Sequence, residues 1–395
     1  MLVASLALAA ACGGDDDSAA PTDDTTDATD EDAAPTDTPD EPETPDEPDT
    51  TDAADPPAGA APDLSAVCPD PLVLQTDWFP SPEHGYAYRL IGDAGTLDAE
   101  NGIFSGPLLD TGIDLEIRAG GPYLGFQPTP ATMYLDDDIH LGYVNTDDKV
   151  ATADGQPTIG VMAPLEINPQ ILMWNPEAYD FETFEDIGES DAAVLVFGGS
   201  VYVDYLVNAG FVRPDQVDPS YDGAPARFVA EDGALAQQGF ATSEPYRYEV
   251  ELEDWGRPVE FLLIHDSGYE IYSQTLSVRT DALDELSPCL EQVVPVFQQA
   301  VVDHWTDPEP TNQLIVEIVD DLDSSWVLAP GQMEYSARTA VELGVVGNGS
   351  DDTVGNFDDD RMERMVELVV DVLGIDDVSP DAVYTNRFID PSIGF

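Results

Sequence analysis

Positive charge is scarce in this chain of 395 residues. It has 12 lysines and arginines against 81 aspartates and glutamates, which gives a formal net charge of −69 at pH 7. Lys149 is the one lysine, and the eleven arginines are scattered along the chain. Binding to nucleic acid requires clusters of Lys and Arg, so this composition argues against nucleic acid as a partner. So acidic a composition favours solubility but does not predict a fold.

Histidine and cysteine are also rare. The four histidines, His84, His140, His265 and His304, show none of the close spacings of zinc ligands, and the chain has no Cys-x-x-Cys. The stretch GGSVY lacks the Gly-Lys-Ser/Thr ending of a phosphate-binding loop. With 81 carboxylates a chance pair is uninformative, so a glycosidase has no specific support. We therefore predict no metal site, no cofactor and no catalytic machinery.

Long apolar runs are missing as well. The run from Leu2 to Ala11 is shorter than the roughly 20 residues that span a bilayer, but it suits the core of an export signal. The residues LALAAACGG (6–14) resemble the lipobox of bacterial lipoproteins, in which a cysteine carries the lipid. The resemblance implies a lipoprotein signal over residues 1–12, lipidation of Cys12 and an extracytoplasmic protein anchored to the cell membrane. The alternative is an apolar N-terminus with an ordinary cysteine.

An acidic segment follows the signal. Between Gly13 and Asp63 there are 19 acidic residues, no Lys or Arg and no aromatic residue, with repeated Thr-Pro-Asp and Glu-Pro units. Such a segment cannot bury enough apolar surface to offset its chain entropy, and repulsion between its charges keeps it extended. We predict a disordered acidic linker over residues 13–67.

The rest of the chain alternates short apolar runs with helical patterns, which is typical of an α/β protein with mostly parallel sheets and flanking helices. Predicted strands lie at residues 71–76, 113–118, 140–145, 158–163, 192–197, 239–242 and 259–264. After about Asp281 the pattern changes to consecutive helices. One has an apolar stripe of Leu290, Val293, Val294, Phe297, Ala300, Val301 and Trp305, and another has Met362, Met365, Val366, Val369, Val372 and Leu373.

Six segments occur in an order typical of one family. They are LQTDWFPSPEHGYAYRL (74–90), GYVNTD (142–147), PLEINPQILMWNPE (164–177), FGGSVYVDYLV (197–207), QQGFATSEPY (237–246) and HDSGYEIY (265–272). Over about residues 70–390 the chain resembles the substrate-binding proteins of ABC importers. The branch is that of thiamine-pyrimidine precursor, nitrate, sulfonate and taurine binders.

The resemblance implies a two-lobed periplasmic binding protein-like fold of type II that closes on its ligand. Lobe one would hold residues 68–168 plus 272–395, and lobe two residues 169–271. The crossings would lie near residues 165–173 and 266–272, where Gly268 can absorb a backbone rotation. An oxidising exterior favours a disulfide between Cys68 and Cys289, both in lobe one; the alternative is two unpaired buried cysteines. A membrane permease would be the partner of a monomer.

Ligands of open parallel sheets bind beyond the carboxyl ends of strands. Directly after the first predicted strand come Asp77, Trp78, Phe79, Glu83, His84 and Tyr86. Aromatic faces beside carboxylates and an imidazole suit a flat nitrogenous ligand, because rings stack and carboxylates accept N–H donors. The alternatives are core packing of the two aromatic rings and a turn histidine.

Other candidate ligand contacts lie later in the chain. Gly198, Gly199 and Ser200 precede a helix with Tyr202, and amides at a helix start can hold an oxygen. The alternative is a tight turn with Ser200 as N-cap. Glu244 and Tyr246 are included for their position in the family, although Ser243 also starts a helix there. Asn145 and Asp266 complete the set.

The sequence therefore predicts an extracytoplasmic receptor that binds a small ligand and performs no chemistry. A flat nitrogen heterocycle such as a thiamine-pyrimidine precursor is favoured, because a sulfonate or nitrate would meet carboxylates with no clustered Arg. Sulfonate, nitrate or taurine binding is the alternative ligand class. An exported enzyme related to pyrimidine precursor synthase is the alternative from another functional class, although the chain lacks the cysteine-rich motif of that enzyme.

Overall fold

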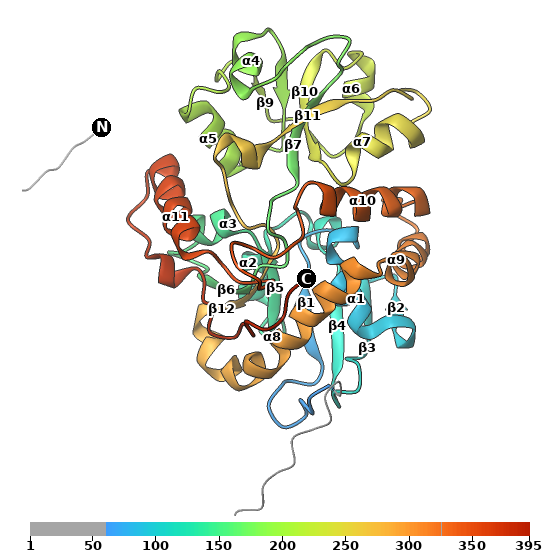
Figure 1. Ribbon diagram of the computed structural model, residues 1–395, viewed down its shortest axis with the longest axis vertical. Coiled ribbons are helices and arrows are strands. Elements are labelled where there is room, and N and C mark those ends of the chain that lie inside the picture. The colour runs from blue at the N-terminus through green and yellow to red at the C-terminus, as the bar shows by residue number, and fades with distance from the viewer. Residues whose placement is uncertain (1–60, 325) are drawn as a thin grey trace, which may run out of the picture. The chain divides into compact units, whose positions relative to one another are not determined.

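The computed structural model describes residues 61–324 and 326–395, which form two separate β-sheets with flanking helices (Figure 1). The predicted signal, Cys12 and most of the predicted linker lie outside the described residues. The large sheet has the order β2 (Thr96–Asp98), β3 (Ile103–Pro107), β4 (Asp114–Arg118), β1 (Leu72–Gln75), β5 (Leu141–Val144), β12 (Thr275–Arg279) and β6 (Thr158–Met162). The small sheet has the order β11 (Glu260–Leu263), β7 (Gln170–Trp174), β10 (Leu235–Phe240), β8 (Ala193–Leu195) and β9 (Val217–Asp218).

Most strands of each sheet run in one direction. Only β3 and β12 oppose the other five strands of the large sheet, and only β7 opposes the other four of the small sheet. Each opposing strand lies between two neighbours, so six of the ten pairings among the described strands are antiparallel. The α/β fold with flanking helices is thus confirmed, while the sheets are mixed in their pairing.

Six of the seven predicted strands coincide with β1, β4, β5, β6, β8 and β11. The seventh, predicted at residues 239–242, is wrong in its position along the chain, because β10 covers Leu235–Phe240. Two buried polar side chains, Gln237 and Gln238, interrupt the apolar pattern of β10, so the pattern did not indicate where the strand begins. The apolar pattern of the sequence did not predict β7 and β12, or the short strands β2, β3 and β9.

The helices cover the sheets on several sides. They are α1 (Gly85–Ile91), α2 (Thr129–Leu135), α3 (Thr146–Ala151), α4 (Phe184–Glu189), α5 (Val201–Asn208), α6 (Ala226–Ala230), α7 (Glu244–Tyr246), α8 (Leu283–Thr306), α9 (Glu309–Asp321), α10 (Pro330–Glu342) and α11 (Asp359–Leu373). The predicted apolar stripe of α8 is buried throughout, as is that of α11 except for Val372 and Leu373. In the described part of the chain, every helix is too short or too polar to cross a membrane.

A disulfide joins Cys68 to Cys289, whose Cα atoms are 4.7 Å apart. It ties the chain just before β1 to helix α8. Leu64 is fully buried, and its amide donates to the carbonyl of Thr111. The predicted linker boundary at residue 67 is therefore too late, because the packed structure already includes Leu64.

The chain passes between the two sheets twice. Residues 163–169 connect β6 to β7, and residues 264–274 connect β11 to β12. The first connection is shorter than predicted, since residues 170–173 belong to β7. In the second, Gly268 has a φ of 95°, a left-handed conformation that glycine adopts without a steric penalty.

Arg361, near the start of α11, binds both connections. Its Nη1 donates to the carbonyl of Glu166 at 2.9 Å, its Nε to that of Glu270 at 2.6 Å and its Nη2 to that of Ile271 at 2.8 Å. Its guanidinium also lies 3.7 Å from the ring centroid of Tyr272. One buried side chain thus fastens the two connections between the sheets, and we call this arrangement the hinge clasp.

Candidate functional site

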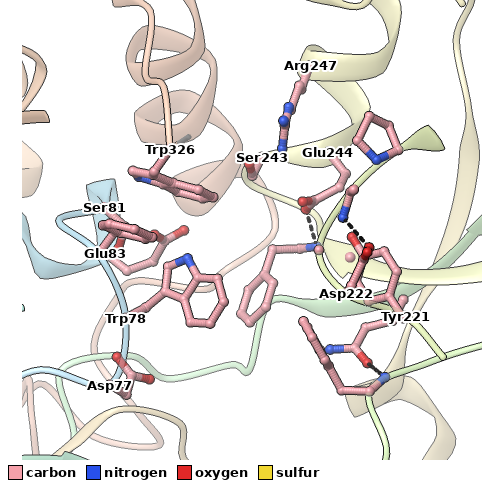
Figure 2. Close-up of a pocket in the computed structure, with 18 of the residues that line it drawn as sticks. Asp77, Trp78, Ser81, Glu83, Tyr221, Asp222, Ser243, Glu244, Arg247 and Trp326 are labelled. Carbon is pink, nitrogen blue, oxygen red and sulfur yellow. Dashed lines mark hydrogen bonds between the residues drawn. The ribbon is translucent and has the colours of Figure 1, made fainter. Parts of the chain in front are cut away.

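A cavity of about 440 Å³ lies where residues of the two sheets meet (Figure 2). It is lined by Asp77, Trp78, Phe79, Ser81, Pro82, Glu83, Pro122, Phe126, Phe197, Tyr221, Asp222, Gly223, Ala224, Pro225, Gln238, Gly239, Phe240, Ser243, Glu244, Arg247, Gln274, Trp326 and Gln332. Most of these residues follow the carboxyl ends of β1, β8, β9 and β10. That is where open α/β sheets bind their ligands, so the cavity is the candidate functional site.

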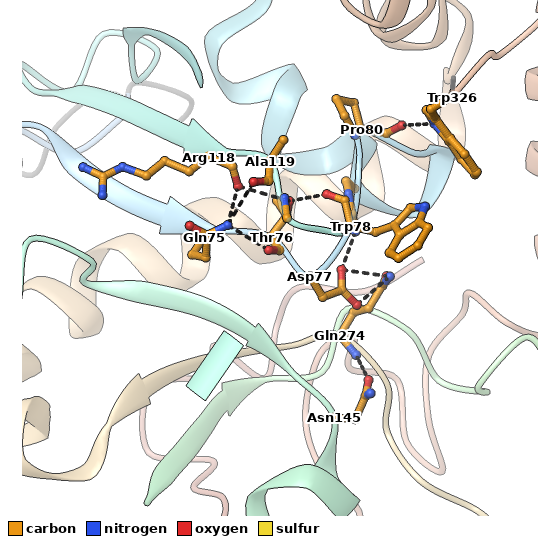
Figure 3. Close-up of polar contacts among 12 residues, drawn as sticks. Gln75, Thr76, Asp77, Trp78, Pro80, Arg118, Ala119, Asn145, Gln274 and Trp326 are labelled. Carbon is orange, nitrogen blue, oxygen red and sulfur yellow. Dashed lines mark hydrogen bonds and ion pairs between the residues drawn. The ribbon is translucent and has the colours of Figure 1, made fainter. Parts of the chain in front are cut away.

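The turn after β1 is held tightly (Figure 3). The side-chain amide of Gln75 donates to the carbonyl of Arg118 at 3.0 Å, and the hydroxyl of Thr76 donates to the carbonyl of Trp78 at 2.7 Å. Gly120 passes so close that a Cβ there would lie 2.4 Å from the Thr76 carbonyl oxygen. Only glycine, which has no Cβ, allows the backbone at residue 120 to pass this close to the turn. The close packing holds the turn in place, with Asp77 and Trp78 at the cavity.

Trp78 is the centre of an aromatic wall. Its ring centroid lies 6.0 Å from that of Phe126, 6.2 Å from that of Trp326 and 6.4 Å from that of Phe197. Trp326 is anchored by a hydrogen bond from its indole N–H to the carbonyl of Pro80, at 3.1 Å. Such separations are typical of interacting aromatic rings, and the faces left open to the cavity can stack on a flat ligand.

Negative charge predominates among the charged lining residues. Four carboxylates, those of Asp77, Glu83, Asp222 and Glu244, face a single positive side chain, Arg247. Glu83 and Glu244 are only 7% and 8% exposed. Burial raises the pKa of Glu244, and the charge of nearby Glu83 raises it further. The amide of Phe240 and the charge of Arg247 lower the pKa by a smaller amount. The site is therefore suited to a ligand that carries positive charge or N–H donors.

Glu83 also links the two sides of the cavity. Its carboxylate accepts a hydrogen bond from the hydroxyl of Thr242, which follows β10 of the small sheet. Gln332 of α10 donates to the hydroxyl of Ser243 at 2.8 Å, and the hydroxyl of Tyr335 donates to the carbonyl of Ala241 at 3.2 Å. The segment after β10 is thus held against η1 (Pro82–His84) and α10.

Asp77 lies in a polar network at the base of the cavity (Figure 3). His84, which is fully buried, places Nε2 3.0 Å from an Asp77 carboxylate oxygen. The Gln274 amide donates to the two Asp77 oxygens at 3.3 and 3.4 Å. Gln274 has a φ of 51°, and its backbone N–H donates to Oδ1 of Asn145 at 2.9 Å. Asn145 and His84 therefore position lining residues and do not line the cavity themselves.

A substitution of Asn145 tests this positioning role. We expect Asn145→Ala to weaken ligand binding about 5-fold, because one hydrogen bond of about 1 kcal/mol no longer holds Gln274 in its left-handed conformation. Isothermal titration calorimetry measures the change. Asn101→Ala is the matched control, since that exposed side chain bonds only to Asp98 among the described residues. Equal affinities of the two variants would contradict the positioning role.

Five of the fourteen predicted ligand residues line the cavity, namely Asp77, Trp78, Phe79, Glu83 and Glu244. The other nine lie elsewhere: His84, Tyr86, Asn145, Gly198, Gly199, Ser200, Tyr202, Tyr246 and Asp266. Tyr86 is buried on α1, with its ring centroid 6.0 Å from that of Tyr143. Tyr86 lies in α1, after η1 has ended, and its ring packs in the core against Tyr143 and Phe297.

The residues before α5 also lie beside the cavity and not in its lining. The hydroxyl of Ser200 donates to the carbonyl of Phe197, which does line it. Tyr202 donates its hydroxyl to Oε1 of Gln238 at 2.8 Å and so positions another lining residue. Tyr246 packs against Tyr335 of α10, and Asp266 is exposed in the second connection.

Most lining residues on the small-sheet side of the cavity were not predicted from the sequence. Phe197, Gln238 and Arg247 lie in or next to segments that were singled out in the sequence. The rule that ligands follow strand ends could have identified Phe197, but Gln238 lies inside β10. Tyr221 follows the two-residue strand β9, which has too few residues for a pattern. Trp326 lies between two helices and Gln274 before an unpredicted strand, so no sequence signal marked either residue.

The described residues hold no group of three or more His, Cys, Asp or Glu side chains that could bind a metal ion. No protein-family model and no curated protein sequence matches the chain.

Solved structures of similar fold do exist. The ligand-binding component of an ABC-type import system from Staphylococcus aureus, solved with zinc bound, aligns with a TM-score of 0.51 at 11% identity, over 81% of this chain and 99% of its own. The periplasmic aliphatic sulphonate binding protein of Escherichia coli aligns with a TM-score of 0.51 at 12% identity, over 82% and 94%. A protein of Bordetella bronchiseptica aligns with a TM-score of 0.52 at 11% identity, over 81% of this chain and 96% of its own. This chain therefore has the two-lobed fold of the periplasmic binding proteins.

Proposed function

We propose that this protein is the extracytoplasmic solute-binding component of an ABC importer. It captures a small molecule between its two lobes and delivers it to a membrane permease, without catalysing a reaction. The observation that carries the proposal is a cavity lined by residues from both sheets, so that closure about the two connections would enclose a ligand. The protein acts as a monomer, held to the membrane by lipid on Cys12.

The ligand in this proposal is a flat nitrogen heterocycle, of the kind of a thiamine-pyrimidine precursor. The aromatic wall around Trp78 provides faces for stacking, and the carboxylates provide acceptors for ring and amino N–H groups. An inorganic anion or simple sulfonate would instead meet four carboxylates and one guanidinium. The balance of charge therefore favours a basic ligand over a purely anionic one.

A thermal-shift screen tests the proposal. We expect aminopyrimidines to raise the melting temperature, because a ligand at 100 times its Kd adds about 2.7 kcal/mol to the free energy of unfolding. Nitrate, taurine and aliphatic sulfonates at the same concentration serve as the comparison. A rise with only the sulfonates or nitrate would refute the heterocycle, and turnover of the aminopyrimidine would refute the role as a binding protein.

A further inference from the structure

Arg247 is the one arginine whose guanidinium makes no hydrogen bond or ion pair within residues 61–324 and 326–395. Nine of the other ten arginines form ion pairs, and the remaining one, Arg89, donates to the carbonyl of Asp307. In a chain with 81 acidic residues, a guanidinium that has no acceptor of any kind among the described residues is an exception. This exception lines the candidate site.

The geometry around Arg247 explains why the adjacent Glu244 does not pair with it, although the charge of Arg247 acts on the carboxylates of both Glu244 and Glu251. Arg247 is half-buried, and its backbone N–H donates to the carbonyl of Ser243 at 3.1 Å. Figure 2 shows its side chain beside Ser243 and Glu244. The side chain of Glu244 is turned toward β10, where Oε2 accepts the backbone N–H of Phe240 at 2.6 Å. The guanidinium therefore keeps its five N–H donors for another group.

Removing a guanidinium partly from water without an acceptor is costly, and a charged partner offsets that cost. We propose that Arg247 binds a carboxylate group of the ligand. The ligand is then bipolar: its basic nitrogen heterocycle meets Asp77 and Glu83 beside the large sheet, and its carboxylate meets Arg247 beside the small sheet. This inference rests on the proposed function.

A bipolar ligand would also favour closure of the cavity, because its two charged ends meet opposite sides of it. Asp77 and Glu83 follow β1 of the large sheet, whereas Arg247 follows α7 and β10 of the small sheet. A molecule with both charges makes favourable contacts on both sides of the cavity, but a molecule with one charge makes them on one side only. Arg247 is therefore a specificity-determining residue, which distinguishes a heterocyclic amino acid-like ligand from a neutral heterocycle.

Two ligands of the same size test this inference: 4-aminopyrimidine-5-carboxylate and 4-aminopyrimidine-5-carboxamide. Calorimetry on the intact protein should show about 10- to 100-fold tighter binding of the carboxylate, as expected for hydrogen bonds to a charged group. Arg247→Gln should remove this preference and leave the affinity for the carboxamide within about 3-fold, while Arg247→Lys should keep part of it. Arg387→Gln is the control for net charge, because Arg387 is half-exposed and does not line the cavity.

The outcomes separate the two proposals. If the wild type binds the carboxamide as tightly as the carboxylate, the role of Arg247 is wrong and the proposed function stands. If the wild type binds neither compound nor any other aminopyrimidine, both are wrong. The comparison of the two ligands on the wild type decides the matter even if Arg247→Gln does not fold. A preference that Arg387→Gln abolishes equally would assign the effect to overall charge and overturn the inference.

Discussion

Replacing Arg361 with methionine is expected to lower the free energy of unfolding by about 3–5 kcal/mol. The substitution removes the buried partner of an ion pair with the partly exposed Glu166 and leaves three carbonyl groups without their donors. Removing one member of such a network costs more than the network contributes, because the groups left behind remain buried and unpaired. Urea denaturation at pH 7.5 measures the loss.

Arg364→Met is the matched control, since the same charge is lost from the same helix. Arg364 is 62% exposed and forms one ion pair, with Glu270. Exposed pairs contribute about 0–1 kcal/mol, so the control should remain close to the wild type. Equal losses in the two variants would show that the hinge clasp adds nothing beyond surface charge.

The second large effect concerns the two buried carboxylates of the cavity. We expect the double variant Glu83→Gln, Glu244→Gln to bind an aminopyrimidine at least about 100-fold more weakly, because each glutamate offers two acceptor oxygens and a charge that the amide lacks. Gln keeps an acceptor for Thr242 and for the amide of Phe240, so the cavity should keep its shape. Titration calorimetry measures the affinity.

The same variant should be more stable than the wild type without ligand at neutral pH. The pKa of Glu244 is raised above its ordinary value of 4.5, so ionising this group costs more in the folded than in the unfolded protein. The contribution of Glu244 to stability therefore falls as the pH rises from 4.5 through the raised pKa. The advantage of the variant should be present at pH 7.5 and vanish below pH 4.5. A wild type that is the more stable protein at pH 7.5 would contradict this account.

The turn after β1 shows how much of the site could be predicted. Asp77, Trp78 and Phe79 follow a short, fully buried apolar strand, and such strands can be recognised from their residues alone. His84 and Asn145 have the same kind of position in the chain, yet each holds a lining residue instead of lining the cavity. Whether a polar side chain meets the ligand or a neighbour depends on side-chain direction, which a sequence pattern does not contain.

Lys149 shows the limit of composition in the same way. The one lysine of a very acidic chain would be expected at the surface, but it is fully buried and donates to the carbonyl of Val144 at 2.8 Å. Burial lowers its pKa to about 7. Its ammonium also donates to the hydroxyl of Thr275, so Lys149 links α3 to β5 and β12 and contributes no positive patch.

By itself, the sequence determined the α/β class, the positions of six of the twelve described strands, the two amphipathic helices and the acidic character of the protein. These properties depend on residues close together in the chain or on composition alone. The tertiary structure decided which side chains share the cavity. Gln274 is 197 residues from Asp77, and Trp326 is 246 residues from Pro80, to which it bonds. Such contacts exist only after both sheets and their connections have formed, so the charges that select a ligand are a property of the fold.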